Sequence, residues 1–169
     1  LYISVTVSVA PLVSRTLYCT AVRRPVPYCV KLPSCGFERA RQIVLRAFEA
    51  FSPDVAAVAG QFFDRRWIDA DVHAGKRGGA FCAGGVPSLH PYVLVNYLGR
   101  SDDVMTVAHE LGHGVHGYLA RERGILLANT PLTTAETASI FGETLVFNDL
   151  FAREREAKVK LAMLVREIE

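Results

Sequence analysis

Two histidines, His109 and His113, stand four residues apart in a stretch that has the pattern of a single long helix. Ser101 can cap the start of that stretch, and the two aspartates after it suit the positive end of a helix dipole. Apolar residues at helical spacing follow, and together these signals predict a helix from Asp102 to about Arg121. On such a helix the four-residue spacing places both imidazoles on one face, one turn apart.

Imidazoles arranged in this way can bind one metal ion, and the residues between them suit the same purpose. Glu110 comes directly after the first histidine, where it would sit beside the ion, hold a water and accept its proton. Gly112 leaves room for another segment to approach closely. His116 lies on nearly the same face, and we interpret it as a histidine that packs against the core or supports a metal ligand, rather than as a ligand itself.

A catalytic zinc site needs a third protein ligand and one open position. Two downstream carboxylates, Glu136 and Glu143, stand seven residues apart on one face of a further predicted helix. Glu136 has a competing structural role, because Thr133 and Glu136 together form a capping-box pattern that could simply close the start of that helix. Residue chemistry alone leaves both carboxylates open as the third ligand, and Glu143 could instead support a ligand or face the substrate.

The rest of the chain after residue 36 alternates helical and strand patterns. Apolar residues recur at helical spacing after Glu38, and Ser52 followed by Pro53 fits the start of a second helix. Glycines make the region from Trp67 to Gly85 rich in loops. The fold class is therefore mainly α with a small β-sheet (α+β). The predicted helices are 38–51, 53–64, 102–121 and 133–154 with a charged helical tail to 169, and the predicted strands are 79–83 and 89–97.

Composition excludes several classes of function. The formal net charge of +2 is too small to indicate a nucleic acid or an anionic membrane as partner. The sequence has no run of the roughly 20 apolar residues that a spanning helix needs. The four cysteines have no zinc-knuckle or redox spacing, so we expect a reducing, cytoplasmic location. Nothing in the sequence indicates an oligomeric state.

The first 36 residues differ from the rest of the chain. They contain three of the four cysteines and four of the eight prolines. We assign residues 1–36 no function, and we expect residues 37–169 to form part of one catalytic domain.

Several segments together resemble a known family. They are Val107–His116, Thr133–Glu143, Trp67–Ala70, Gly75–Cys82 and His90–Tyr97. From about Phe37 to the C-terminus, the chain resembles the oligoendopeptidase F branch of the thimet oligopeptidase superfamily of zinc metallopeptidases. The resemblance implies a zincin-like catalytic core of a helical oligopeptidase, with one Zn²⁺ per chain and short peptides as substrates.

The resemblance also implies roles for individual residues. Glu136 matches the family's third zinc ligand, beside His109 and His113, and Glu143 matches a second glutamate that supports the site. A sheet edge in the family binds the substrate backbone by strand addition. Here that edge would be 79–83 or 92–97, with the candidate residues Gly79, Ala80, Phe81, Tyr92 and Tyr97.

Three hypotheses follow. In the first, the chain is the core of a zinc metalloendopeptidase with Glu110 as general base. In the second, it is a truncated, non-catalytic zinc-binding fragment, because relatives continue with a segment whose His and Tyr bind substrate. We accordingly expect this chain alone to bind zinc and to cleave short peptides weakly or not detectably. In the third, it is a plain helical domain in which the motif is accidental.

Overall fold

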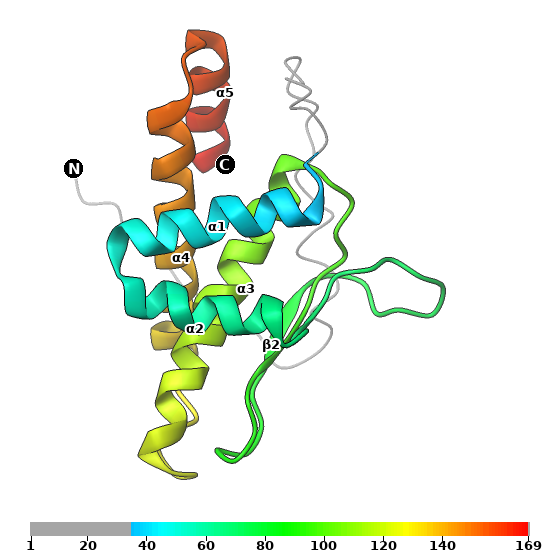
Figure 1. Cartoon of the computed structure of the whole chain (residues 1–169), viewed down its shortest axis with the longest axis vertical. Coiled ribbons are helices and arrows are strands. Elements are labelled where there is room, and N and C mark those ends of the chain that lie inside the picture. Colours follow the sequence, from blue (N-terminus) through cyan, green and yellow to red (C-terminus); the bar gives the residue numbers. More distant parts are fainter. Residues whose placement is uncertain (1–34, 169) are drawn as a thin grey trace, which may run out of the picture.

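The computed structural model describes residues 35–168, and these form a mainly helical fold with one small sheet (Figure 1). This confirms the predicted fold class. The unassigned N-terminal stretch lies outside the described residues, except for Cys35 and Gly36. In chain order the elements are α1 (Phe37–Phe51), α2 (Pro53–Asp64), β1 (Ile68–Asp69), β2 (Phe81–Ala83), β3 (Tyr92–Leu94), α3 (Ser101–Ala120), the short 3₁₀ helix η1 (Arg121–Arg123), α4 (Leu132–Arg153) and α5 (Ala157–Ile168).

Of the three helix starts that the sequence assigns to a capping residue, one is correct. Ser52 is the N-cap of α2, where its hydroxyl accepts the Val55 N–H at 3.5 Å, and Pro53 is the first helical residue. The predicted Ser101 cap of α3 is wrong. Ser101 is already helical, and the cap position is Arg100, whose N–H donates to the buried Asp103 carboxylate at 2.9 Å.

The predicted capping box at Thr133 is also wrong. Helix α4 begins one residue earlier, at Leu132, and Pro131 occupies the cap position without any side-chain cap. The Pro131 carbonyl accepts the N–H groups of Thr134 and Ala135, so the first turn forms without help from Glu136. The carboxylate of Glu136 therefore does not cap the start of α4, and it remains available as a metal ligand.

The three strands form a mixed sheet in the order β1-β3-β2. Strand β3 pairs in parallel with β1 and antiparallel with β2, so that Val93 lies beside both Ile68 and Cys82. The sequence does not predict β1. Because β3 lies between its neighbours, the alternative that 92–97 forms the substrate-binding edge is wrong. Within the described part of the chain, β2 is an edge.

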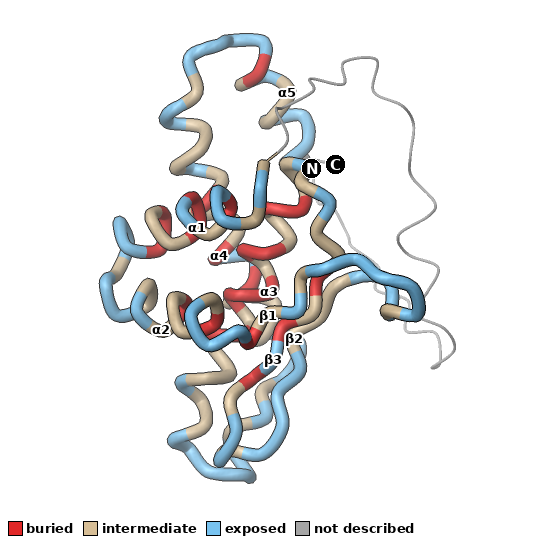
Figure 2. The backbone as a smooth tube through the Cα atoms, turned by 45° about the vertical axis from the view of Figure 1, so that its right-hand side comes forward, coloured by how far each residue is buried: buried red, intermediate tan, exposed pale blue. Residues whose placement is uncertain are grey.

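The core lies where the two N-terminal helices cross the two long ones. In Figure 1, α1 and α2 lie across α3 and α4, and in Figure 2 the buried positions gather along α1, α3 and the sheet. The side chains of Phe48, Phe62 and Leu111 are fully buried there. Phe62 packs edge-on against Trp67 with ring centroids 5.2 Å apart, which connects the end of α2 to the sheet.

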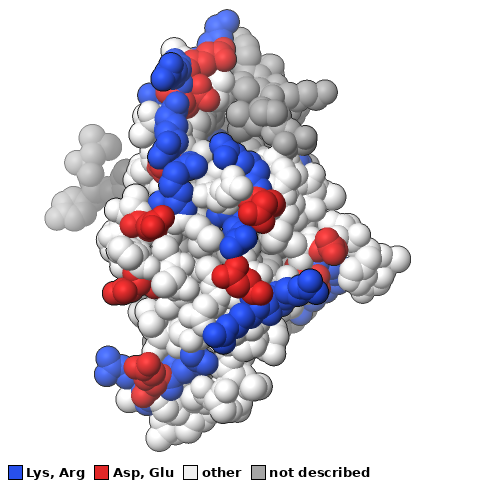
Figure 3. Space-filling model, in the orientation of Figure 1, with Lys and Arg blue, Asp and Glu red and all other residues white. Residues whose placement is uncertain are grey.

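The surface carries both signs of charge. Figure 3 shows Lys and Arg side chains interspersed with Asp and Glu over one face. Arg41 contacts Asp64 at 2.7 Å, and Arg153 contacts Asp149 at 2.8 Å. No helix among residues 35–168 is both long enough and apolar enough to cross a membrane.

Candidate metal centre

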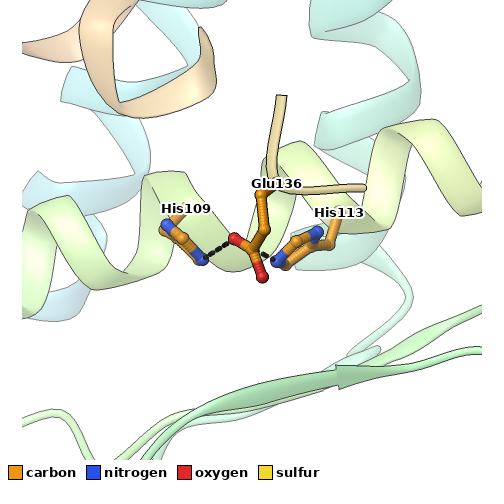
Figure 4. Close-up of side chains that lie close together, drawn as sticks. All are labelled: His109, His113 and Glu136. Atoms are coloured by element: carbon orange, nitrogen blue, oxygen red, sulfur yellow. Dashed lines mark ion pairs between the residues drawn. The ribbon is translucent and has the colours of Figure 1, made fainter. Parts of the chain in front are cut away.

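Three side chains from two helices converge in Figure 4, where the strands of the sheet run below them. His109 and His113 come from α3 and Glu136 comes from α4. One ligand atom of each residue lies within 4.8 Å of those of the other two. The arrangement brings together two imidazoles and one carboxylate, which is a donor set that zinc favours.

The two helices approach so closely because glycines stand where they cross. A Cβ atom placed on Gly112 of α3 would lie 2.5 Å from the Ala138 carbonyl oxygen, and one placed on Gly142 of α4 would lie 2.8 Å from the Ala108 carbonyl oxygen. Each glycine thus contacts the backbone of the opposite helix. Because backbone cannot rotate away, no larger residue fits at this separation, and the close approach brings Glu136 level with the histidines.

One hydrogen bond orients the His109 imidazole, and both imidazoles face the same Glu136 oxygen. His109 Nδ1 lies 3.2 Å from Glu143 Oε2, and His109 Nε2 lies 3.5 Å from Glu136 Oε2. A proton on Nδ1, donated to Glu143, leaves the Nε2 lone pair directed at the centre. His113 Nε2 lies 3.7 Å from the same Glu136 oxygen. Glu143 lies outside the three-residue group and contacts it through His109.

The two histidines differ in basicity. The hydrogen bond that His109 donates to Glu143 raises the pKa of His109 and outweighs the opposing effect of burial. Burial lowers the pKa of His113, and the charge of His109 lowers it further. In the absence of an ion, a proton on this pair therefore favours His109. Since a metal ligand must be neutral, an ion would have to displace that proton.

Glu110 is buried beside the group, with a side chain that points toward the sheet. Glu110 is only 6% exposed, and its Oε2 has no hydrogen-bond partner within residues 35–168. Burial is the main reason that the pKa of Glu110 is raised to about 7, while the charge of His109 and the backbone N–H of Cys82 act in the opposite direction. A buried oxygen without a partner is costly. It fits a site that is completed by an ion and its water.

The sheet edge lies next to this carboxylate. Val93 donates its N–H to Trp67 at 2.9 Å, on the β1 side. Cys82, which is opposite Val93, therefore directs its backbone groups away from β3 and toward the outer edge. Its N–H interacts there with Glu110, whose negative charge in turn raises the pKa of the half-buried Cys82 thiol beyond the effect of desolvation.

The structure brings some of the remaining candidates to the site and leaves others apart. Phe81 begins β2, whereas Gly79 and Ala80 precede the strand. The Gly79 carbonyl accepts the Asn96 side chain at 2.8 Å. The Tyr97 hydroxyl donates to the Cys35 carbonyl at 2.6 Å, so it is engaged elsewhere. Tyr92 is 52% exposed, with its ring 4.3 Å from that of His90.

Two further residues bear on the site in different ways. His116 is half-buried on α3 and lies outside the ligand group, although its charge contributes to lowering the pKa of His113. Sequence reasoning did not single out Ser139, a fully buried residue whose hydroxyl lies 3.0 Å from Glu136 Oε2. Its position three residues after Glu136, on the same helix, is the signal that could have found it.

Comparison with known proteins matches most of this chain to one family. Residues 41–169 match the model of peptidase family M3. The chain is 32% identical over 130 residues to chromosomal oligoendopeptidase F of Lactococcus lactis subsp. cremoris, covering 76% of this chain and 21% of that protein. It is 28% identical over 134 residues to oligopeptidase PepF of Bacillus subtilis, covering 79% and 20% respectively.

A crystal structure from Chlamydophila abortus superposes with a TM-score of 0.75 at 28% identity, over 80% of this chain and 23% of that one. The chain thus spans about a fifth of the length of the relatives that it matches.

Proposed function

This chain belongs to peptidase family M3, and from that premise we propose that it carries the zinc-binding catalytic core of an oligoendopeptidase. The observation that carries the proposal is the convergence of His109, His113 and Glu136 beside a buried Glu110 with a partnerless oxygen. Family membership alone would leave open whether this chain keeps the site. The donor set and the carboxylate beside it favour that it does.

We propose His109, His113 and Glu136 as the ligands of one zinc ion. When bound, zinc supplies Lewis-acid chemistry, which polarises a scissile carbonyl and makes a neighbouring water easier to deprotonate. Glu143 accepts the Nδ1 proton of His109 and so keeps the Nε2 lone pair available. This arrangement also makes the imidazole a stronger donor, because the carboxylate stabilises its partial positive charge.

Glu110 is the proposed general base. Its partnerless oxygen can take a proton from water and return it to the leaving amine. A pKa of about 7 would let the carboxyl both accept and release protons near neutral pH. A cation held by the three ligands would lower that pKa, because an opposite charge nearby favours the carboxylate.

The substrates that we propose are short peptides bound along β2. An extended peptide can add to a free strand edge by backbone hydrogen bonds. The outward-facing carbonyl of Cys82 offers one such acceptor, on the side where Glu110 lies. Strand addition at this edge would therefore bring a peptide backbone next to the proposed base.

Zinc content and peptide cleavage, measured on the same sample, test the proposal. We expect about one zinc per chain, from three protein ligands and an open position. His113→Ala should lose the metal, and Glu136→Ala should bind it measurably but much more weakly through the two remaining imidazoles. Glu110→Gln should retain zinc and lose cleavage of a quenched peptide. A zinc-free protein after metal-replete expression would contradict the proposal. Zinc without any cleavage would favour a metal-binding module that has no turnover.

A further inference from the structure

Ser139 lies on α4 one turn after Glu136, and its side chain is fully buried. Its hydroxyl oxygen is 3.0 Å from Glu136 Oε2 and 3.0 Å from the Glu136 carbonyl oxygen. We infer that Ser139 is a positioning residue, whose hydroxyl fixes the Glu136 carboxylate in the orientation that binds the metal ion. This inference rests on the proposed zinc site and adds a residue to it.

The hydroxyl has one proton and two acceptors within reach. The Glu136 carbonyl lies within α4, where it is an acceptor of the helical N–H four residues on. The carboxylate carries a negative charge, and hydrogen bonds to a charged acceptor are roughly twice as strong as neutral ones. Since Ser139 is shielded from water, its proton has these two acceptors, and the charged one is favoured.

The hydroxyl is held in a fixed place relative to the histidines. Ser139 lies at the helix crossing, where its Cα would be 2.7 Å from a Cβ atom placed on Gly112. Gly112 stands between His109 and His113 in the same turns of α3. A donor anchored at this contact therefore fixes the carboxylate in the frame of the two imidazoles.

Glu136 needs such a partner because its side chain is long and half-exposed. Within residues 35–168, Ser139 provides the one side-chain hydrogen bond to this carboxylate, whose other polar neighbours are the two imidazoles. A glutamate side chain left free would lose rotamer freedom on binding the ion, which would weaken binding. Orientation by Ser139 before the ion arrives removes part of that cost.

The test is zinc affinity, measured on the 169-residue chain by competition with a chromophoric chelator. Ser139→Ala should weaken zinc binding about 10- to 100-fold, the usual effect of losing a partner of a metal ligand. Thr137→Ala is the matched control, because Thr137 also donates a hydroxyl to an α4 carbonyl, that of Thr133 at 2.8 Å, without contacting Glu136 Oε2. This control should bind zinc like the parent.

A double-mutant cycle separates positioning from a general structural role. In a Glu136→Ala background, Ser139→Ala should change affinity by less than about twofold, because the group that it orients is gone. The melting temperature of the metal-free protein, recorded for each variant, reports any loss of packing. Ser139→Thr keeps the hydroxyl and should retain most of the affinity, even if the added methyl group lowers the melting temperature.

Four outcomes decide the matter. Weaker binding in Ser139→Ala, absent from Thr137→Ala and from the Glu136→Ala background, supports the inference. Equal affinities of Ser139→Ala and Thr137→Ala overturn it while leaving the zinc site intact. An equal loss with and without Glu136 overturns it in favour of packing. A parent chain that binds no zinc overturns the zinc site and this inference together.

Discussion

The glycine at the helix crossing provides a sharp test of how the site is built. In Gly112→Ala the new Cβ would lie 2.5 Å from the Ala138 carbonyl oxygen, where ordinary contact begins at 3.4 Å. It would also lie 2.7 Å from the Ser139 Cα. Both obstacles are backbone atoms of α4, so no side-chain rotation relieves the clash. To restore ordinary contact at 3.4 Å from the present 2.5 Å, the two helices must move apart by roughly 0.9 Å.

Overpacking and helix propensity have opposite effects on the stability of this variant, and only overpacking displaces the helices that carry the metal ligands. Overpacking costs about 1–3 kcal/mol, while alanine in a helix interior is favoured over glycine by about 1 kcal/mol. The net loss of folding free energy should therefore be about 0–2 kcal/mol, which leaves the protein folded. Metal ligands tolerate only about 0.2 Å of displacement, so a separation several times larger should weaken zinc binding by tenfold or more. We expect a folded protein with an impaired site.

Gly60→Ala is the matched control. Gly60 is inside α2, and a Cβ atom there would meet nothing within 4 Å. The substitution should stabilise the protein by about 0.4–1 kcal/mol and leave zinc binding unchanged. Chelator competition measures the affinity, and urea unfolding of the metal-free protein measures stability. Parental zinc affinity in Gly112→Ala would refute the argument that backbone contact between α3 and α4 sets the distance between the ligands.

Two more substitutions test contacts around the site and away from it. Glu143→Gln removes the charge that faces His109 and should weaken zinc binding by about tenfold, as measured by chelator competition; unchanged affinity would show that Glu143 does not orient the imidazole. Burial raises the pKa of Asp149, but hydrogen bonds from Arg46 and Arg153 outweigh it and keep the pKa below its ordinary value of 3.8. A lowered pKa stabilises the fold above the ordinary value, and the stabilisation is lost as the pH falls through the lowered one. Asp149→Asn should thus destabilise the protein by about 1 kcal/mol at neutral pH and match the parent in strong acid, and a gap that persists below the lowered pKa would contradict this.

Features of the fold that depend on local signals are those that the sequence predicts well. Ser52 followed by Pro53 sets a helix start within one turn, and the structure has that start. At Thr133 the local pattern misleads, because Pro131 has a φ of −58° and its carbonyl completes the first turn of α4 one residue earlier. Two valid local signals compete there, and the earlier one prevails.

Features that depend on distant partners are not visible in the sequence. Strand β1 has two residues and exists because it pairs with β3, far along the chain. The central place of β3, which makes the 92–97 edge alternative wrong, is likewise decided by that pairing. Among the site residues, the spacing of His109 and His113 predicts a shared face. Ser139 escapes such reasoning because its role depends on the helix crossing and on its rotamer.

The ligand atoms converge only while α3 and α4 are docked, and this ties metal supply to stability by mass action. An ion that binds the docked pair and not the separated helices stabilises the native state by about 4 kcal/mol when its free concentration is a thousand times Kd. That is a large share of the roughly 5–15 kcal/mol by which a domain of ordinary size is stable. In a metal-poor medium, the docking of α3 and α4 would then depend more on packing contacts such as that of Gly112 with Ala138 than it does in a metal-rich one. Scarcity of the ion would thus raise the population of molecules in which α3 and α4 are separated, even with all three ligand residues present.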